Sequence, residues 1–253
     1  MKEIESIINI KTTLSYEKAF LYFLQLLKDN FCFPTPVRKE NNGTAVPIYR
    51  SRIIEGNCNN LNIKEIKHRC ANEVSTFGRI NRPNQAYFYA CDDYENCLKE
   101  LDKEIKFKKE CKKEFVVITG QWTLKKDLIV CIIPDWNNPR MLPFINKVES
   151  LKNISEENLE ILKYINTLFL KEDNNSNIHR VTSAFCNAIL FNAINQNINF
   201  DGFLYTCVKD GTGYNLALFP HVIDNGDIIL TSVVKNYIET KQIDLKSGKI
   251  IWQ

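Results

Sequence analysis

Residues 77–91, FGRINRPNQAYFYAC, form the stretch of sequence that decides the fold. The first part is a basic loop with one glycine, and residues 86–91 are rich in aromatic side chains, which favours a β-strand. Residues 93–105 follow with apolar side chains at helical spacing, which predicts an amphipathic helix. A positively charged loop, a tyrosine-rich strand and a helix therefore succeed one another in the chain.

Signals on the N-terminal side of this stretch predict a separate helical segment. Apolar side chains fall on one helical face over residues 15–30, and Ser15 is a suitable N-cap. A segment with two prolines and then a polar stretch follow over residues 31–43, which makes this region the best candidate for a linker. We therefore expect residues 1–44 to form an N-terminal helical extension and residues 45–253 to form one domain.

The remaining pattern mixes strands and helices without strict alternation. Helices are predicted over residues 155–170, with Ser155 as N-cap, and over residues 177–194. Strands are predicted over residues 47–52, 115–119, 128–133, 203–208, 215–219, 228–234 and 237–243, with a closing hairpin through residues 247–248. Because a doubly wound parallel sheet requires strict alternation, we expect an α+β fold instead.

Composition and charge exclude several functional classes. Lys plus Arg is 33 and Asp plus Glu is 30, so the net charge is +3, and no basic block predicts nucleic-acid binding. No apolar run is long enough to span a bilayer, and the first residues lead into no apolar signal segment, so neither a membrane nor a secretory route is expected. The nine cysteines include no Cys-x-x-Cys pair, which favours reduced thiols in a cytoplasmic protein.

The sequence contains no strong motif for a metal or a nucleophile. Cys58, His68 and Cys70 have a spacing that fits no closed zinc site, so no metal is expected. The three histidines lie in no recognisable nucleophile motif. Residues 211–213 precede a strand rather than a helix, so they are interpreted as a hairpin turn and not as a phosphate loop.

Glu100 is the one carboxylate with a position that suggests chemistry. On a helical wheel it lies at the edge of the apolar stripe of residues 93–105, where a carboxylate can sit half desolvated at the rim of a pocket. The alternative is a solvated helix glutamate paired with a neighbour such as Lys103, which is the common situation for this residue type. The pattern alone leaves both interpretations open.

Several segments, taken in order, resemble the RES domain family, which is named for an arginine, a glutamate and a serine. Its members are bacterial toxins with an ADP-ribosyltransferase-like fold that degrade NAD. The similar segments are Tyr49-Arg50, residues 78–81, residues 87–90 with Glu100 eleven residues after Tyr89, residues 120–128, 201–205 and 213–220. The resemblance covers roughly residues 45–222 and implies a mixed sheet core with flanking helices in addition to the N-terminal extension.

The chain departs from the family at the serine. That residue should follow Tyr205 by two positions, where this sequence has Cys207, with Thr206 beside it. A thiol is a weaker hydrogen-bond donor and acceptor than a hydroxyl. Either Thr206 substitutes for the serine, or the site is weakened and its activity has drifted, or Cys207 is only a buried strand cysteine.

The resemblance implies roles for particular residues in cleavage of NAD at the nicotinamide–ribose bond. Glu100 would stabilise the positive charge that develops on the ribose. Arg50 would bind the pyrophosphate through two donors of its guanidinium, Arg52 on the same strand face would share that task, and Arg79 is a second candidate. Tyr89 would stack on nicotinamide or ribose, and Thr206 or Cys207 would contact the nicotinamide ribose or its amide.

The resemblance also implies partners and leaves alternatives open. NAD would be the substrate, and no metal is required. A cognate antitoxin would cover the pocket, and a homo-oligomer is a further possible assembly. The acceptor of the ribosyl group could be water, phosphate or a macromolecule. The competing functions are an ADP-ribosyltransferase that modifies a macromolecule and a catalytically weakened NAD-binding module.

Overall fold

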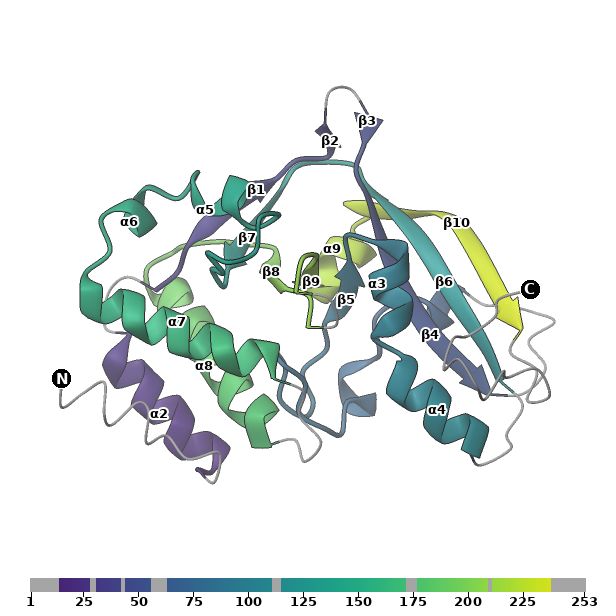
Figure 1. Ribbon diagram of the computed structural model, residues 1–253, viewed down its shortest axis with the longest axis horizontal. Coiled ribbons are helices and arrows are strands. Elements are labelled where there is room, and N and C mark those ends of the chain that lie inside the picture. Colours follow the sequence, from purple (N-terminus) through teal and green to yellow (C-terminus); the bar gives the residue numbers. More distant parts are fainter. Residues whose placement is uncertain are drawn as a thin grey trace.

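The computed structural model describes residues 14–27, 31–41, 44–55, 63–110, 115–171, 177–208 and 211–237. These residues form a mixed α+β fold around one eight-stranded sheet with the order β1-β7-β8-β9-β5-β4-β6-β10 (Figure 1). The strands are β1 (Pro34–Val37), β4 (Pro47–Glu55), β5 (Phe88–Cys91), β6 (Phe115–Leu124), β7 (Leu128–Ile132), β8 (Gly202–Thr206), β9 (Tyr214–Leu218) and β10 (Ile228–Tyr237). Strands β2 (Glu40–Asn41) and β3 (Thr44–Ala45) form a separate two-stranded hairpin. The expected α+β class is confirmed.

One pair of neighbouring strands in the sheet is parallel, and the other neighbours are antiparallel. Strands β7 and β8 form the parallel pair. A parallel pair cannot be joined by a tight turn. The connection between them accordingly contains the helices α5 (Leu142–Ile145), α6 (Glu149–Lys152), α7 (Glu156–Leu170) and α8 (Asn177–Asn195).

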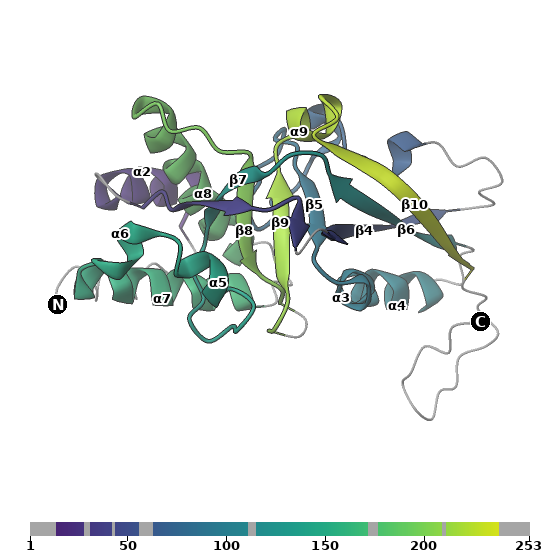
Figure 2. The same ribbon diagram turned by 90° about the horizontal axis from the view of Figure 1, so that it is seen from above.

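The helices gather at two ends of the sheet, as Figures 1 and 2 show. Helices α2 (Tyr16–Leu26), α7 and α8 lie at the end that carries β1, β7 and β8. Helices α3 (Tyr94–Lys99) and α4 (Asp102–Glu110) lie beside β4 and β6. Short turns complete the fold: 3₁₀ helices η1 (Ile63–Glu65) and η2 (Ala71–Glu73), and helix α9 (Pro220–Asp224). The middle of the sheet therefore lies between the helices of the two ends.

Local signals account for the two helices that the sequence predicts best. The Ser15 hydroxyl accepts a hydrogen bond from the Lys18 amide at 3.3 Å, and the Ser155 hydroxyl accepts one from the Asn158 amide at 3.2 Å. Each serine thus satisfies an amide that the first helical turn leaves without a partner. Both predicted N-caps are confirmed.

A strand lies where the sequence predicts a linker. Strand β1 pairs in antiparallel orientation with β7 at the edge of the sheet, and Thr35 and Val37 on it are buried. Pro34 and Pro36 lack an amide donor, which an edge strand tolerates because one of its sides has no neighbour. The linker prediction is therefore wrong over residues 34–37, because pairing with β7 outweighs the local proline signal. The proposed domain boundary at residue 44 stays a prediction.

Other differences lie in the lengths of elements. The helix predicted over residues 93–105 is two helices, α3 and α4, since the Leu101 amide bonds to the Leu98 carbonyl at 2.9 Å and tightens the chain at that point. Strand β6 continues through Trp122, where a break between strands was expected, and Trp122 is buried. The predicted strand over residues 237–243 and the hairpin at residues 247–248 lie outside the described residues, apart from Tyr237 at the end of β10.

Among helices of the described ranges, none combines the length and the apolar character that crossing a bilayer requires.

Candidate functional site

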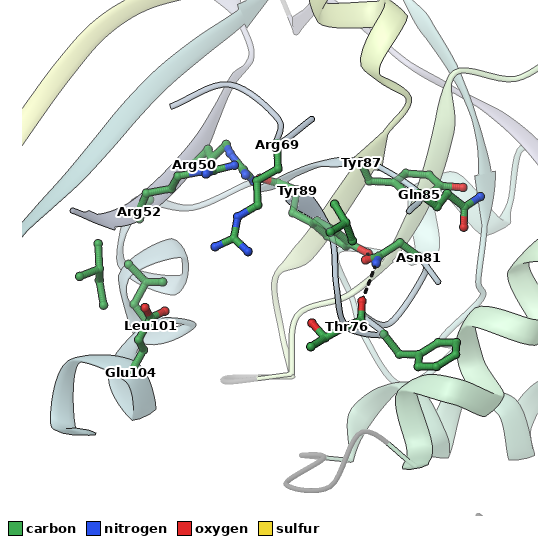
Figure 3. A pocket seen from close by; sticks show the side chains of 15 residues that line it. Arg50, Arg52, Arg69, Thr76, Asn81, Gln85, Tyr87, Tyr89, Leu101 and Glu104 are labelled. Atoms are coloured by element: carbon green, nitrogen blue, oxygen red, sulfur yellow. Dashed lines mark hydrogen bonds between the residues drawn. The ribbon is translucent and has the colours of Figure 1, made fainter. Parts of the chain in front are cut away.

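A cavity opens where two neighbouring strands of the sheet separate. Strands β4 and β5 share a single residue pair, Tyr49 with Cys91, whereas β4 pairs with β6 along nine positions. The cavity has a volume of about 260 Å³ and is lined by side chains of β4, β5, α4 and the loops that precede β5 (Figure 3). The separation of the strands thus creates a site that tight pairing would have closed.

Arg50 spans the gap between the two strands. Its Nε donates to the Ile66 carbonyl at 3.0 Å and its Nη1 donates to the Tyr89 carbonyl at 2.6 Å, while the guanidinium lies over the Phe88 ring at 5.1 Å. Burial lowers the pKa of Arg50 to about 9. Arg50 lines the cavity, but two of its donor groups already hold the backbone, so it has fewer left for a ligand.

Arg52 lies beside Arg50 and also lines the cavity. Its Nη2 donates to the Lys67 carbonyl at 2.8 Å. Its Nε is buried and has no hydrogen-bond partner in the described part of the chain. Burial, and secondly the neighbouring Arg69, lower the pKa of Arg52 to about 10. An unsatisfied buried N–H is a donor that a ligand anion could satisfy.

Arg69 is a candidate site residue that the sequence analysis missed. Its exposed side chain lines the cavity, and Figure 3 shows its guanidinium turned into the open space. Within the described ranges the guanidinium makes no hydrogen bond and no ion pair. The run Lys67-His68-Arg69 was the signal available, yet only the fold brings it next to β4. Arg69 is therefore the arginine best able to bind an anion with a complete fork of donors.

Tyr89 is held by the basic loop that precedes it. Its hydroxyl donates to Oδ1 of Asn81 at 2.7 Å and accepts from the Ile80 amide at 3.3 Å. A Cβ at Gly78 would overlap that Asn81 oxygen and would lie 3.1 Å from the Tyr89 hydroxyl, so a larger residue there would displace the Asn81 side chain that holds Tyr89. Burial raises the pKa of Tyr89. The ring of Tyr89 lines the cavity, while its hydroxyl is hydrogen-bonded to the loop at residues 80 and 81.

Arg79 lies away from the cavity, at the C-terminal end of helix α7. Its Nη1 donates to the Phe169 carbonyl at 2.6 Å and to the Lys171 carbonyl at 3.0 Å, at the C-terminus of α7. A cation at this position satisfies the last carbonyl groups of the helix and interacts favourably with its dipole. Arg79 is not among the residues that line the cavity. The arrangement thus gives it a structural task, whereas its role with a ligand stays a prediction.

Glu100 lies next to the cavity and contacts a second group of residues. It is the residue that ends α3, and Leu101 directly after it lines the cavity. Oε1 of Glu100 accepts a hydrogen bond from Nδ2 of Asn215 at 3.2 Å, and the thiol of Cys207 donates to the same oxygen at 3.5 Å. The structure therefore brings Glu100 and Cys207 together, and Glu100 itself is not part of the cavity lining.

Thr206 and Cys207 lie in different surroundings. Thr206 is fully buried, donates to Oδ2 of Asp135 at 2.9 Å and accepts from Nδ2 of Asn138 at 3.1 Å. Adjacent residues of a strand point to opposite faces, so Thr206 turns away from Glu100 while Cys207 approaches it. Of Thr206 and Cys207, only Cys207 reaches the carboxylate of Glu100.

The three arginines of the cavity can bind an anionic ligand, and Glu100 beside the cavity can polarise a neighbouring group of that ligand. Arg50, Arg52 and Arg69 face one cavity, and Glu104 is the one carboxylate among its lining residues. No group of three His, Cys, Asp or Glu side chains that could hold a metal occurs within the described ranges, and Cys58 lies outside them.

No protein-family model, no curated protein and no solved structure matches this chain.

Proposed function

We propose that this protein is an enzyme of the RES type that binds NAD and cleaves its nicotinamide–ribose bond. The observation that carries the proposal is the cluster of Arg50, Arg52 and Arg69 around the cavity between β4 and β5, with Tyr89 in its wall and Glu100 beside it. A dinucleotide offers the matching groups, namely a dianionic pyrophosphate and aromatic bases. The proposal includes an ADP-ribosyltransferase-like fold, which is compatible with the mixed sheet in which β4 and β5 share a single residue pair.

In the proposed reaction the C–N bond between ribose and nicotinamide breaks, and its electron pair leaves with the neutral base. Positive charge then develops on the ribose, and the acceptor forms the new bond at the same carbon. Glu100 stabilises that charge or polarises a ribose hydroxyl, which for a positioned group of this kind contributes about 10²–10⁴-fold. Water, phosphate and a macromolecule all remain acceptors that this chemistry permits.

The hydrogen bonds of the arginines change the role that we expect for each of them. Arg69 and the Nε of Arg52 have donors available within the described ranges, so they bind the pyrophosphate in this proposal. Arg50 contributes its charge while its Nε and Nη1 hold the carbonyl groups of Ile66 and Tyr89. Tyr89 offers its ring face for stacking against a base or ribose.

The biological part of the proposal follows from the resemblance. The enzyme acts in the cytoplasm as the toxin of a toxin–antitoxin pair, and the antitoxin covers the cavity. Nothing about the cavity requires a metal, because the nicotinamide leaving group is already cationic in NAD.

The test compares wild type with Glu100→Gln in bacteria, with cellular NAD measured after induction. We expect NAD loss and growth arrest with wild type, and neither with the variant, because the amide cannot supply the negative charge. Glu95→Gln is the matched control, since Glu95 is an exposed glutamate of the same helix, and it should behave as wild type. Equal NAD levels with wild type and Glu100→Gln would overturn the catalytic assignment.

A second candidate is a binding module that holds NAD without turning it over. The observation that favours it is Cys207, because its thiol approaches Glu100 at 3.5 Å where a hydroxyl would make a shorter and stronger bond. Purified protein incubated with NAD separates the two: free nicotinamide indicates cleavage, whereas NAD binding by calorimetry without free nicotinamide indicates the module. Label transferred from NAD to a macromolecule would instead indicate ADP-ribosyl transfer.

A further inference from the structure

Asn215 on β9 is a buried polar residue in the middle of the sheet. Its backbone lies between Tyr205 of β8 and Cys91 of β5, and the residue is only 5% exposed. Asparagine is disfavoured in strands, and a buried amide costs free energy unless its donors and acceptor find partners. The position therefore calls for a physical reason beyond the packing of the strand.

The side chain of Asn215 is directed at Glu100. Its Nδ2 donates to Oε1 of Glu100 at 3.2 Å. A carboxylate only accepts hydrogen bonds, so the amide nitrogen and not the amide oxygen must face it. The amide oxygen, Oδ1, is consequently turned away, and it is buried with no hydrogen-bond partner in the described part of the protein.

The unpaired oxygen shows that this amide is not optimised for stability. A buried acceptor without a partner lowers the stability of the folded state, and an apolar side chain of similar shape would avoid that cost. What the amide supplies here is one N–H bond to the carboxylate of Glu100. Asn215 thus orients the carboxylate of Glu100, while its own Oδ1 has no hydrogen-bond partner in the described part of the protein.

We propose that Asn215 is a positioning residue for the reaction, and the inference rests on the proposed function. Asn215 and Cys207 both donate to Oε1 of Glu100. Oε2 accepts no hydrogen bond from the described residues, so it is the oxygen left for the ribose of NAD. The two donors fix one oxygen of the carboxylate and thereby aim the other.

Glu100 needs such support because of its place in the chain. It lies at the junction of α3 and α4, on a side chain with three rotatable bonds, and it is only partly buried. Asn215 belongs to a central strand with neighbours on both sides, so its position is well determined. A misplacement of about 1 Å in a reacting group can cost about 10²-fold in rate.

The first experiment measures kcat and KM for NAD cleavage in Asn215→Leu, together with its urea unfolding midpoint. Asn166→Leu is the matched control, since Asn166 is also a buried asparagine, 7% exposed on α7, with an unpaired Oδ1 in the described part of the chain. We expect kcat of Asn215→Leu to fall about 10- to 100-fold with KM changed less than about 2-fold and folding retained, and the control to keep the kcat of wild type.

A second variant covers the case in which leucine does not fit. Asn215→Asp keeps the shape of the side chain, cannot donate to Glu100 when ionised, and places a like charge beside it. Its kcat should fall at least as far as that of Asn215→Leu. A wild-type kcat in either folded variant, or a change confined to KM, would overturn the inference.

The third measurement does not depend on turnover. A double-mutant cycle of Asn215→Leu and Glu100→Met, followed by urea unfolding, should give a coupling of about tenfold or more in the unfolding equilibrium constant, because the bond involves a charged group. Absence of coupling would overturn the inference. If wild type does not cleave NAD while the coupling is present, the proposed function fails and the contact between Asn215 and Glu100 stands.

Discussion

At the scale of single residues, the site depends on which polar groups are already committed and which remain available. Arg50 holds two backbone carbonyl groups across the gap between β4 and β5. Arg69 has its guanidinium in the open cavity (Figure 3). The two arginines should therefore respond differently to mutation, although both line the same cavity.

Arg69→Ala should raise KM for NAD about tenfold while leaving kcat and the unfolding midpoint unchanged, because the lost charge binds only ligand. Arg50→Ala should also lower the free energy of unfolding by about 1–3 kcal/mol, because two carbonyl groups lose their donor. Steady-state kinetics and urea unfolding measure both effects. Arg82→Ala is the control, as Arg82 is exposed and lies outside the cavity lining. An unchanged KM in Arg69→Ala would refute the assignment.

Cys207→Ser should retain or raise the activity. The hydroxyl is the stronger donor and would approach Oε1 of Glu100 more closely than the thiol, which lies at 3.5 Å. Cys207→Ala removes the donor and should lower kcat. Single-turnover measurements of nicotinamide release compare the three proteins. A large loss in Cys207→Ser would mean that the reaction uses the thiol itself.

At the scale of elements, short polar contacts decide how the edge of the sheet is held. The backbone amide of Lys39 donates to Asp127 at 2.8 Å, and Arg38 donates to the same carboxylate at 2.5 Å. These contacts tie the end of β1 to the turn before β7. The amide of Lys39, and secondly Arg38, lower the pKa of Asp127 from its ordinary value of 3.8.

The lowered pKa of Asp127 predicts an acid-dependent contribution to stability. A carboxyl group whose pKa is lower in the folded state stabilises the fold at pH values above its ordinary pKa. It loses that effect as the pH falls through the pKa of the folded state. Wild type should therefore have a higher urea midpoint than Asp127→Asn at neutral pH, and the difference should shrink below about pH 4. A difference that stays constant from pH 7 to about pH 3 would contradict this linkage.

At the scale of the whole molecule, the N-terminal residues belong to the same core as the sheet. Phe23 of α2 is fully buried and contacts Phe185 of α8 with ring centroids 5.3 Å apart. The Phe33 carbonyl accepts a hydrogen bond from the Ile132 amide at 3.0 Å. The described residues before position 45 thus contribute side chains and a strand to the fold that carries the cavity.

Phe23→Ala should accordingly lower the free energy of unfolding by about 3–5 kcal/mol, since it leaves a cavity between α2 and α8. Urea denaturation followed by circular dichroism measures the change. A fragment of residues 45–253 should fail to unfold cooperatively, because it lacks β1 and exposes the face of α8 that α2 covers. A fragment with the unfolding midpoint of the full chain would support an independent extension instead.

The elements that could be predicted from sequence are those with a local cause. Ser15 and Ser155 marked two helices because capping involves neighbouring residues, and the aromatic segment before Cys91 marked β5. The break between α3 and α4 escaped prediction, because the apolar stripe runs through it and Leu98 and Ile105 still belong to one cluster. The strand at Pro34–Val37 escaped because its stability comes from β7, almost a hundred residues away.

The sequence by itself determined the class of the fold, the charge balance and the best helices, since these follow from composition and periodicity. The candidates Arg50, Tyr89 and Glu100 came from the resemblance to the RES family. Tertiary structure alone decided that β4 and β5 meet at one residue pair, that Arg69 enters the resulting cavity, that Arg79 caps α7, and that Asn215 reaches Glu100. Such contacts join residues far apart in sequence, and their free energy depends on strand pairing and burial, which no local pattern encodes.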